Sequence, residues 1–346
     1  MSGAAIGPDV GLEDSGRAQA DDDAVVASIL LIAFNQQDTV GQAIAAALAQ
    51  TFTPLEILIS DDASSDDTWS EIQRAVAGYN GPHRVVLNRN PVNLGIGAHL
   101  SHLVAVSQGE LLFVAAGDDV SVPQRCERVV AAWLDSNKQL DLIASTLVDM
   151  DEQGGVHQII TPSDLASYRN AADWLARPPH VVGAAQAWTR RLFKRFGPLP
   201  QGVVAEDLIM VFRAIVSGGA TTLNEPLVRY RRGGISRRRR ALHASEVVER
   251  LLKNNRHALV ELPQLLADAQ VAGQLDAVRN ELNQRLARER HIQQLFRATS
   301  MLDKLALSMR TTDIPPSLRL RWLMYAAFPW FAAPFFALKR LVANRL

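Results

Sequence analysis

The feature that most constrains the fold is a set of short apolar runs that are each followed by polar or acidic residues. The first three runs cover residues 28–34, 55–60 and 111–116. They are almost continuously apolar and rich in β-forming residues, as expected of strands that are covered on both faces. An acidic pair follows the second run directly, and another follows the third run after one glycine. Because parallel strands end at the same edge of an open sheet, the sequence predicts a polar site at that edge.

Helical patterns alternate with these runs. Asp38 is expected to cap a helix that reaches about residue 49, with apolar and small side chains on one face. Further helices are expected after Gly97 and Pro123, and further strands at 84–87 and 140–147. This alternation predicts an α/β fold with a mostly parallel, Rossmann-like central sheet that is flanked by helices.

The pattern becomes irregular after this alternation. Residues beyond 154 contain glycine and proline pairs, and within them we expect a helix at 186–196. Another helix is expected to start at the acidic pair Glu206-Asp207. Residues 245–307 are highly charged with apolar residues at helical spacing, which predicts a helical C-terminal extension that packs against the α/β domain.

A segment near the C-terminus differs from the rest of the chain. Residues 322–338 contain no charge, are rich in aromatic residues, and include Pro329 and Pro334. A straight helix of this length would reach only about 25 Å, short of the roughly 30 Å hydrocarbon core of a bilayer. Basic residues flank the segment, so we expect it to lie in the cytoplasmic leaflet of a membrane. A buried terminal helix or a partner-binding surface is the alternative.

Length and composition bound the remaining possibilities. The 346 residues exceed the needs of one core. We therefore expect a flexible tail at 1–24, a main domain at 25–240, a helical extension at 241–312 and a membrane-associating segment at 313–346. The 36 basic residues equal the 36 acidic ones, which argues against nucleic acid as a partner. The single Cys126 excludes a disulfide framework within the chain and favours a cytoplasmic location.

Several motifs in a fixed order resemble the inverting family 2 glycosyltransferases, which have the nucleotide-sugar-binding GT-A fold. The similarity runs over residues 26–236, and the motifs are Ile32-Ala33-Phe34-Asn35, Gln50-Thr51-Phe52, Ser60 to Thr68, Asn93-Leu94-Gly95-Ile96-Gly97, Gly109-Glu110, Gly117-Asp118-Asp119, Glu206-Asp207 and Tyr230-Arg231 with Ser236. Each motif is weak alone, whereas the ordered set is specific. The resemblance implies a GT-A domain for the main α/β part.

The resemblance also implies where the donor nucleotide binds. It places Phe34 and Asn35 beside the base and makes Asp61 the acceptor for an imide N–H, which favours UDP or dTDP. Asn93 and Gly95 belong to the same substrate-binding region. The alternative for Asp61 and its neighbour is a simple turn. We interpret Ser65 and Asp66 as caps of the following helix.

The second acidic pair is expected to serve a divalent cation, Mn²⁺ or Mg²⁺. Such an ion can bridge the two phosphates of the leaving nucleotide while one or two carboxylates hold it. The resemblance makes Asp119 the metal ligand, whereas Asp118 would contact the ribose or a metal-bound water. Ala116 and Gly117 stand where family members commonly carry a further acidic residue. An acidic turn before the helix near Pro123 is the alternative.

The third acidic pair is expected to serve the acceptor. Inverting transfer is one in-line displacement, so a carboxylate must take the proton of the attacking hydroxyl. The resemblance gives this role of general base to Asp207 and lets Glu206 contact the acceptor. The alternative is a favourable placement of two acidic residues at a helix N-terminus. Arg231 and Arg232 are expected near the diphosphate, where guanidinium groups suit phosphate oxygens.

Together these features predict a cytoplasmic, metal-dependent glycosyltransferase at the inner face of the cell membrane. It would move a sugar from a nucleoside-diphosphate sugar to a hydroxyl of a glycan or lipid-linked glycan. Assembly of bacterial surface polysaccharide or lipopolysaccharide is the expected context. Two alternatives stay open at the level of sequence: a nucleotidyltransferase that makes nucleotide sugars, and a non-catalytic family member that scaffolds a membrane assembly.

Overall fold

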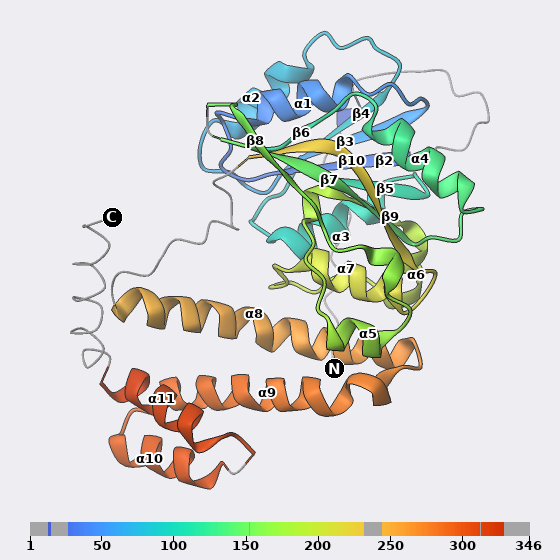
Figure 1. Cartoon of the computed structure of the whole chain (residues 1–346). Coiled ribbons are helices and arrows are strands. Elements are labelled where there is room, and N and C mark those ends of the chain that lie inside the picture. The colour runs from blue at the N-terminus through green and yellow to red at the C-terminus, as the bar shows by residue number, and fades with distance from the viewer. Residues whose placement is uncertain (1–12, 15–26, 152, 232–243, 312, 329–346) are drawn as a thin grey trace, which may run out of the picture. The chain divides into compact units, whose positions relative to one another are not determined.

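The computed structural model describes residues 13–14, 27–151, 153–231, 244–311 and 313–328 (Figure 1). The chain divides into two compact units, 1–235 and 236–346. Most of the expected tail 1–24 and the stretch 329–346 of the expected membrane segment lie outside the described residues.

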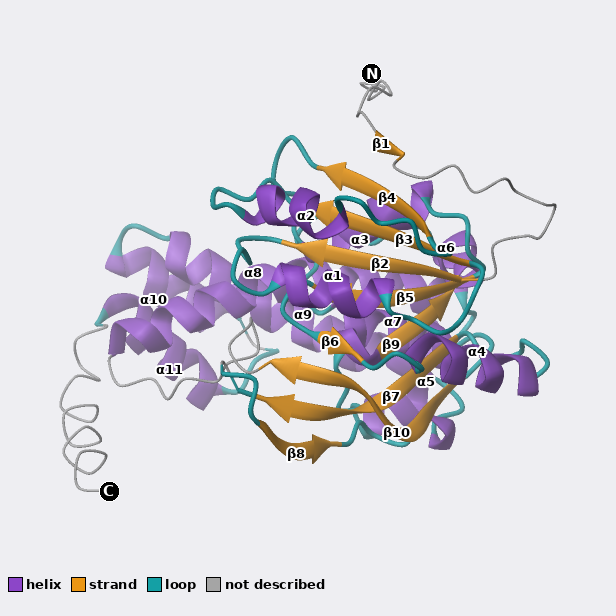
Figure 2. Ribbon diagram, turned by 90° about the horizontal axis from the view of Figure 1, so that it is seen from above, coloured by secondary structure: helices purple, strands orange, loops and turns teal. Residues whose placement is uncertain are grey.

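The first unit is built on one sheet. Its strands lie in the order β1-β4-β3-β2-β5-β9-β7-β10-β6, and β8 pairs with β7. Their bounds are β1 (Glu13–Asp14), β2 (Ala27–Ala33), β3 (Leu55–Asp61), β4 (Arg84–Arg89), β5 (Leu111–Ala116), β6 (Val120–Ser121), β7 (Leu142–Met150), β8 (Val156–Ile160), β9 (Gln186–Thr189) and β10 (Ala220–Arg231). Strands β2 to β5 pair in parallel, as predicted, so their carboxyl ends lie at one edge (Figure 2).

Helices cover both faces of this sheet. Their bounds are α1 (Val40–Leu48), α2 (Thr68–Val76), α3 (Ile96–Val106), α4 (Arg125–Asp135), α5 (Ala171–Ala176), α6 (Arg190–Phe196) and α7 (Glu206–Ile215), with short 3₁₀ turns at Leu165–Ser167 and Gly183–Ala185. Alternate residues of β2, namely Ala27, Ile29, Leu31 and Ala33, belong to a core cluster with α1, α2 and α4. Figure 1 shows α3 and α7 on the opposite face. Burial on both faces explains why the strands are almost continuously apolar.

Two local predictions were wrong. Residues 186–196 are not one helix, because Gln186–Thr189 forms β9 between β5 and β7 and only the rest is α6. A four-residue strand is too short to show a period of two, and the antiparallel pairing that fixes it comes from distant segments. Asp38 is not the cap of α1. The helix begins after Thr39, whose hydroxyl donates to the carbonyl of Gly117 at 2.9 Å.

The second unit is helical, as predicted. Its helices are α8 (Ala244–Val271), α9 (Leu275–Arg297), α10 (Met301–Arg310) and α11 (Pro316–Ala327). Ile292, Leu295, Ile314, Trp322 and Leu323 form its buried cluster. The first part of the apolar segment 322–338 therefore packs inside this unit. Among the described residues, no helix combines the length and the apolar character that crossing a bilayer requires.

Candidate active site

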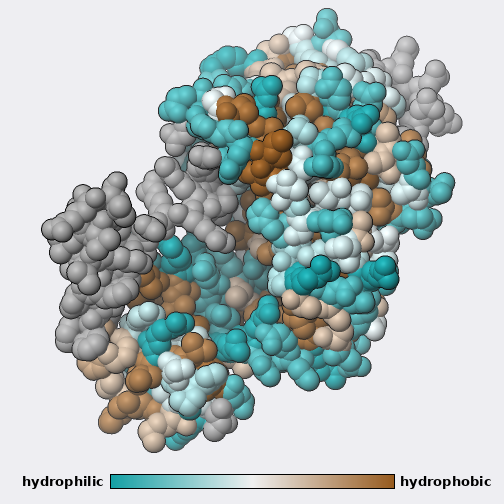
Figure 3. Space-filling view, in the orientation of Figure 1, coloured by the Kyte–Doolittle hydropathy of each residue, from teal (hydrophilic) through white to brown (hydrophobic). Residues whose placement is uncertain are grey.

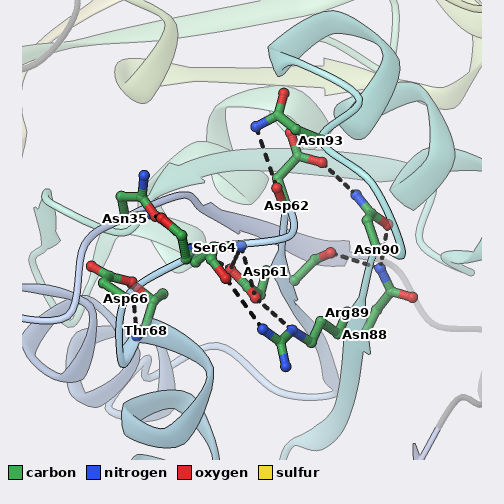
Figure 4. A network of polar contacts seen from close by, with 12 residues as sticks. Asn35, Asp61, Asp62, Ser64, Asp66, Thr68, Asn88, Arg89, Asn90 and Asn93 are labelled. Atoms are coloured by element: carbon green, nitrogen blue, oxygen red, sulfur yellow. Dashed lines mark hydrogen bonds and ion pairs between the residues drawn. The ribbon is translucent and has the colours of Figure 1, made fainter.

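The first corner of the site is the turn after β2. Asn35 has a φ of 51°, in the left-handed region that few residues other than glycine adopt. Its backbone N–H donates to Ser64 Oγ at 2.8 Å, and its side-chain Oδ1 accepts from the N–H of Ser65 at 2.9 Å (Figure 4). These bonds join the turn after β2 to the loop after β3. Phe34 comes directly before Asn35 and is 47% exposed, so a flat apolar side chain is accessible at the carboxyl edge.

Asp61 ends β3 and is completely buried. Its carboxylate accepts bonds from the N–H and the hydroxyl of Ser64, and from Arg89 Nε at 3.1 Å (Figure 4). Arg89 ends β4, and its side chain is 45% exposed. Because protein donors already surround the Asp61 carboxylate, its direct contact with a nucleotide base stays a prediction.

Asp62 has a role that the sequence did not indicate. Its carboxylate accepts bonds from the N–H groups of Leu94 and Gly95, at 2.9 and 3.0 Å, and from Asn90 Nδ2 at 2.8 Å. The side-chain amide of Asn93 donates to the Asp62 carbonyl at 3.3 Å (Figure 4). Asp62 therefore fixes the predicted substrate-binding segment 93–95 against the end of β3. The sequence signal that could have indicated this role is the pair Asn88 and Asn90 at the end of β4.

The loop after β3 also starts the next helix. Asp66 Oδ1 accepts from the N–H of Thr68, the first residue of α2, at 3.0 Å. The N-cap position is Asp67, so the prediction that Asp66 caps the helix was wrong by one residue. Burial opposes ionisation of Asp66, but its bonds from Thr68 and its neighbours hold the pKa of that carboxyl below its usual value. Ser65 is not a cap, because its N–H and hydroxyl both donate to Asn35.

Asp118 and Asp119 lie in the turn between β5 and β6. Burial raises the pKa of Asp119 well above its usual value, and the neighbouring Asp118 raises it further. Burial raises the pKa of Asp118 as well, although its own backbone N–H, the Arg231 charge and a bond from Gln36 oppose this. A pair of carboxyls in this state is short of positive charge, and a hard divalent cation at this edge would supply it.

Gly117 is required by the close approach of Gln36. A Cβ at this position would lie 2.5 Å from Gln36 Oε1 and 3.1 Å from the Cβ of Ala33. An acidic side chain at this position would therefore displace Gln36. Among the described residues, no three His, Cys, Asp or Glu side chains form a metal-binding group. A site here must rely on one or two carboxylates together with phosphate oxygens of the ligand.

Arg231 ends β10 and holds the acidic turn in place. Its N–H donates to Asp119 Oδ1 at 2.8 Å, and its guanidinium donates to the Asp118 carbonyl at 3.1 Å and to Gln42 Oε1 at 2.8 Å. The residue is 9% exposed. The structure thus gives Arg231 a positioning role, and its contact with a diphosphate stays a prediction. Arg232 lies outside the described residues.

Glu206 and Asp207 begin α7, as predicted. Glu206 is 7% exposed and packs against Gly183, where a Cβ would lie 2.6 Å from its Oε1. Asp207 is half-buried, and its Oδ1 accepts from the N–H of Leu208 at 2.8 Å. Gln186 Nε2 donates to the Asp207 carbonyl at 3.4 Å. The start of α7 therefore rests on the segment 183–186.

A buried arginine that the sequence did not single out connects this segment to the second acidic pair. Arg125 donates through Nη2 to the carbonyls of Val114 in β5 and Ala184, at 2.9 and 2.7 Å. It is 3% exposed, and burial lowers its pKa to about 10 while the nearby charge of Asp119 opposes that shift. Arg125 thus places a positive charge beside Asp119 and fixes the support of Asp207. Pro-x-Arg after an acidic pair is the sequence signal that could have indicated it.

Comparison with known proteins identifies relatives of part of the chain. Residues 28–197 match the family described as glycosyl transferase family 2. The chain is 29% identical over 136 residues to EpsE of Bacillus subtilis, whose name assigns it to the glycosyltransferases, and this match covers 39% of the chain and 48% of EpsE. It is 29% identical over 92 residues to WfaP of Escherichia coli, named as a UDP-Glc:α-D-GlcNAc-diphosphoundecaprenol β-1,3-glucosyltransferase. That match covers 27% of the chain and 35% of WfaP. The chain therefore matches less than half the length of these two relatives.

Solved structures show the same fold. The crystal structure of residues 1–349 of S. aureus TarS in complex with UDP superposes with a TM-score of 0.51 and 14% sequence identity. The superposition covers 90% of this chain and 91% of that one. Residues 28–197 therefore form a glycosyl transferase family 2 domain, and the chain has the GT-A fold. The family and the fold class predicted from the motifs are confirmed.

Proposed function

We propose that the chain is a metal-dependent inverting glycosyltransferase that uses a nucleoside-diphosphate sugar as donor. The observation that carries this proposal is the pair Asp118 and Asp119, half-buried and buried in the turn after β5, where burial raises the pKa of both carboxyls and a divalent cation would favour their charged forms. Asp119 would hold Mn²⁺ or Mg²⁺, and Asp118 would contact the ribose or a metal-bound water. The bound ion would neutralise the charge that develops on the leaving diphosphate.

The donor is proposed to be a UDP or dTDP sugar. The exposed ring of Phe34 offers a face on which a pyrimidine base can stack, beside the turn that Asn35 and Ser64 hold together. UDP in the TarS complex and UDP-Glc in the name of WfaP support the choice of a uridine nucleotide. Asn93 and Gly95 would line the same donor site, because Asp62 fixes their segment at this edge.

The reaction is proposed to be one displacement at the anomeric carbon. A carboxylate oxygen of Asp207 accepts the proton of the acceptor hydroxyl as that oxygen bonds to the anomeric carbon. The bond from this carbon to the diphosphate oxygen breaks, and the nucleoside diphosphate leaves with the electron pair. Glu206 would orient the acceptor from the neighbouring position. The acceptor is proposed to be a glycan or a lipid-linked glycan, as the name of WfaP suggests. The enzyme would then act peripherally at the inner face of the cell membrane, in surface polysaccharide assembly.

Asp207→Asn is the variant that tests the role of the base. Release of nucleoside diphosphate would be followed with UDP, dTDP and GDP sugars and a lipid-linked glycan acceptor, with Mn²⁺ present. We expect the variant to lose at least about 100-fold in turnover while its thermal stabilisation by UDP and Mn²⁺ is unchanged.

Asp173→Asn is the matched control, because Asp173 also lies in the first turn of a helix, α5. It should keep full turnover. Turnover that survives in Asp207→Asn would show that Asp207 only stabilises the start of α7.

A further inference from the structure

Helix α10 presents an apolar stripe on the outside of the second unit. Met301, Leu302, Leu305 and Met309 are 39%, 79%, 38% and 78% exposed. At 3.6 residues per turn, these four side chains fall within about 100° of the helix circumference. None of the ten residues of α10 is buried. An amphipathic helix normally turns such a stripe toward the core, whereas α10 turns it outward.

Polar contacts attach α10 to α11. Lys304 Nζ donates to the carbonyl of Ala326 in α11 at 2.8 Å, and Arg319 of α11 donates to the carbonyl of Ser308 at 2.7 Å. The buried cluster of this unit draws on α9, α11 and the residues between helices, and its described members include no side chain of α10. The outward orientation of the stripe is therefore fixed by the contacts that hold the helix. Figure 3 shows apolar surface over α10 and α11.

Basic side chains accompany this stripe. Arg297 and Arg310 are exposed at the ends of α9 and α10, and Arg321 is exposed in the middle of α11. Over residues 297–328 the sequence has five basic and two acidic residues, although the whole chain is neutral. Exposed Leu and Met side chains flanked by basic residues are typical of a helix that lies in the interface of an anionic bilayer.

We propose that the stripe of α10 docks on the surface of a membrane that contains anionic lipid. Burial of four apolar side chains in the acyl boundary and attraction of the arginines to headgroups would act together. A second copy of the chain is a poorer occupant, because a two-fold contact would bring together two copies of the same positively charged patch. The inference rests on the proposed transfer to a lipid-linked acceptor for its biological purpose, and it places the membrane contact on α10.

Co-sedimentation of the full chain with lipid vesicles tests this inference without any substrate. We expect binding to phosphatidylcholine vesicles that contain about 30% phosphatidylglycerol, and at least about tenfold weaker binding for Leu302→Ser/Met309→Ser. Arg310→Gln/Arg321→Gln should lose about tenfold on these vesicles and little on neutral ones. Val156→Ser/Ile159→Ser is the matched control, because these side chains are 54% and 62% exposed on β8. It should bind as the wild type does.

Three results would overturn the inference. The first is that the wild type does not bind vesicles. The second is that Leu302→Ser/Met309→Ser binds vesicles as tightly as the wild type does. The third is that the wild type is a dimer and that this double variant is a monomer with unchanged vesicle binding. Thermal stabilisation by UDP with Mn²⁺, recorded on the same preparations, shows that each variant is folded. If UDP with Mn²⁺ does not stabilise a wild type that still binds vesicles, the proposed transferase activity is rejected and the proposed membrane contact is retained.

Discussion

The two acidic pairs at the carboxyl edge look alike in sequence but have different surroundings. Asp61 and Asp62 accept bonds from Ser64, Arg89, Asn90 and the N–H groups of residues 94 and 95. Asp118 and Asp119 lie in a turn where burial raises the pKa of both. The first pair therefore acts as a structural clamp: its carboxylate oxygens accept hydrogen bonds that hold the neighbouring loops in place. The second pair accepts fewer bonds from the chain, and the charges of Arg125 and Arg231 nearby do not offset the effect of burial.

The difference shows what separates a structural acidic pair from a ligand-binding one. A carboxylate surrounded by donors is stable in its charged form and gains little from a cation. A buried carboxyl with few donors is held back from ionising until a cation arrives. Position at the strand ends is common to both pairs, so position alone does not assign the metal site. We expect the number of donors supplied by the chain to decide which pair binds a cation.

The clamp should matter most for folding. Asp62→Ala would leave the side-chain amide of Asn90 and two backbone N–H groups without their acceptor, so we expect a loss of about 3 kcal/mol in the free energy of unfolding. Urea denaturation measures this loss. Asp67→Ala, a change at an exposed aspartate of the same loop, should stay within about 0.5 kcal/mol. Equal stability of the two variants would mean that Asp62 is not a clamp.

The second pair should matter most for cation binding. We expect Asp119→Asn to weaken Mn²⁺ binding in the presence of UDP by about 100-fold, or about 2.7 kcal/mol, because the side chain loses the charge that holds the ion. Without metal the variant should be at least as stable as the wild type, since it no longer buries an ionisable carboxyl. Calorimetric titration and urea denaturation measure the two effects. If Asp119→Asn loses much stability without metal, Asp119 has a structural role like that of Asp62.

The raised pKa of Asp119 also predicts how stability depends on pH. In the unfolded chain this carboxyl loses its proton near the ordinary value of 3.8, whereas the folded chain keeps it to higher pH. Because the folded state then binds more protons, the contribution of Asp119 is complete below pH 3.8 and is lost as the pH rises through the folded value. Relative to Asp119→Asn, the metal-free wild type should lose stability as the pH rises from 3.8 through the folded pKa of Asp119.

The comparison with Asp119→Asn is needed because His99 acts in the opposite direction. Burial lowers its pKa from 6.5 to about 4, so its contribution to stability is lost as the pH falls toward that value. Both proteins contain His99, and its effect cancels in the difference. Parallel stability curves for the two proteins over this range would contradict the raised pKa of Asp119. Saturating Mn²⁺ should reduce the slope in the wild type alone.

The smallest effect is expected at Phe34. Phe34→Ala removes the exposed ring beside the clamp, and we expect UDP to bind about 1 kcal/mol more weakly without any change in its dependence on Mn²⁺. Phe34→Tyr keeps a flat face and should bind UDP as the wild type does. Calorimetry on both variants measures this. Equal affinity for UDP in the wild type and Phe34→Ala would exclude stacking on Phe34.

The sequence predicted the part of the fold that rests on local signals. Strands β2, β3 and β5 are buried on both faces, so their apolar runs are long and their ends are clear. Strand β8 was missed because four of its five residues are exposed, which leaves no apolar period to detect. Strand β9 was missed because it is defined by its antiparallel neighbours β5 and β7 and not by its own pattern.

The same limit applies to the candidate site. The acidic pairs could be located from their place after apolar runs, and the motif order identified the family. The clamp role of Asp62 could not be predicted, since it depends on Asn90 and on a loop that only the sheet brings close. Arg125 was missed for the same reason, because its acceptors Val114 and Ala184 lie 11 and 59 positions away along the chain.

The central claim is that the second acidic pair, and not the first, serves a cation bound with a nucleotide. The most direct test is calorimetric titration of UDP in Mn²⁺ and in EDTA, on the wild type, Asp119→Asn and Asp62→Asn. The wild type and Asp62→Asn should bind UDP at least about tenfold more tightly with Mn²⁺, and Asp119→Asn should bind it equally in both buffers. Dependence on Mn²⁺ that survives in Asp119→Asn but disappears in Asp62→Asn would contradict the account.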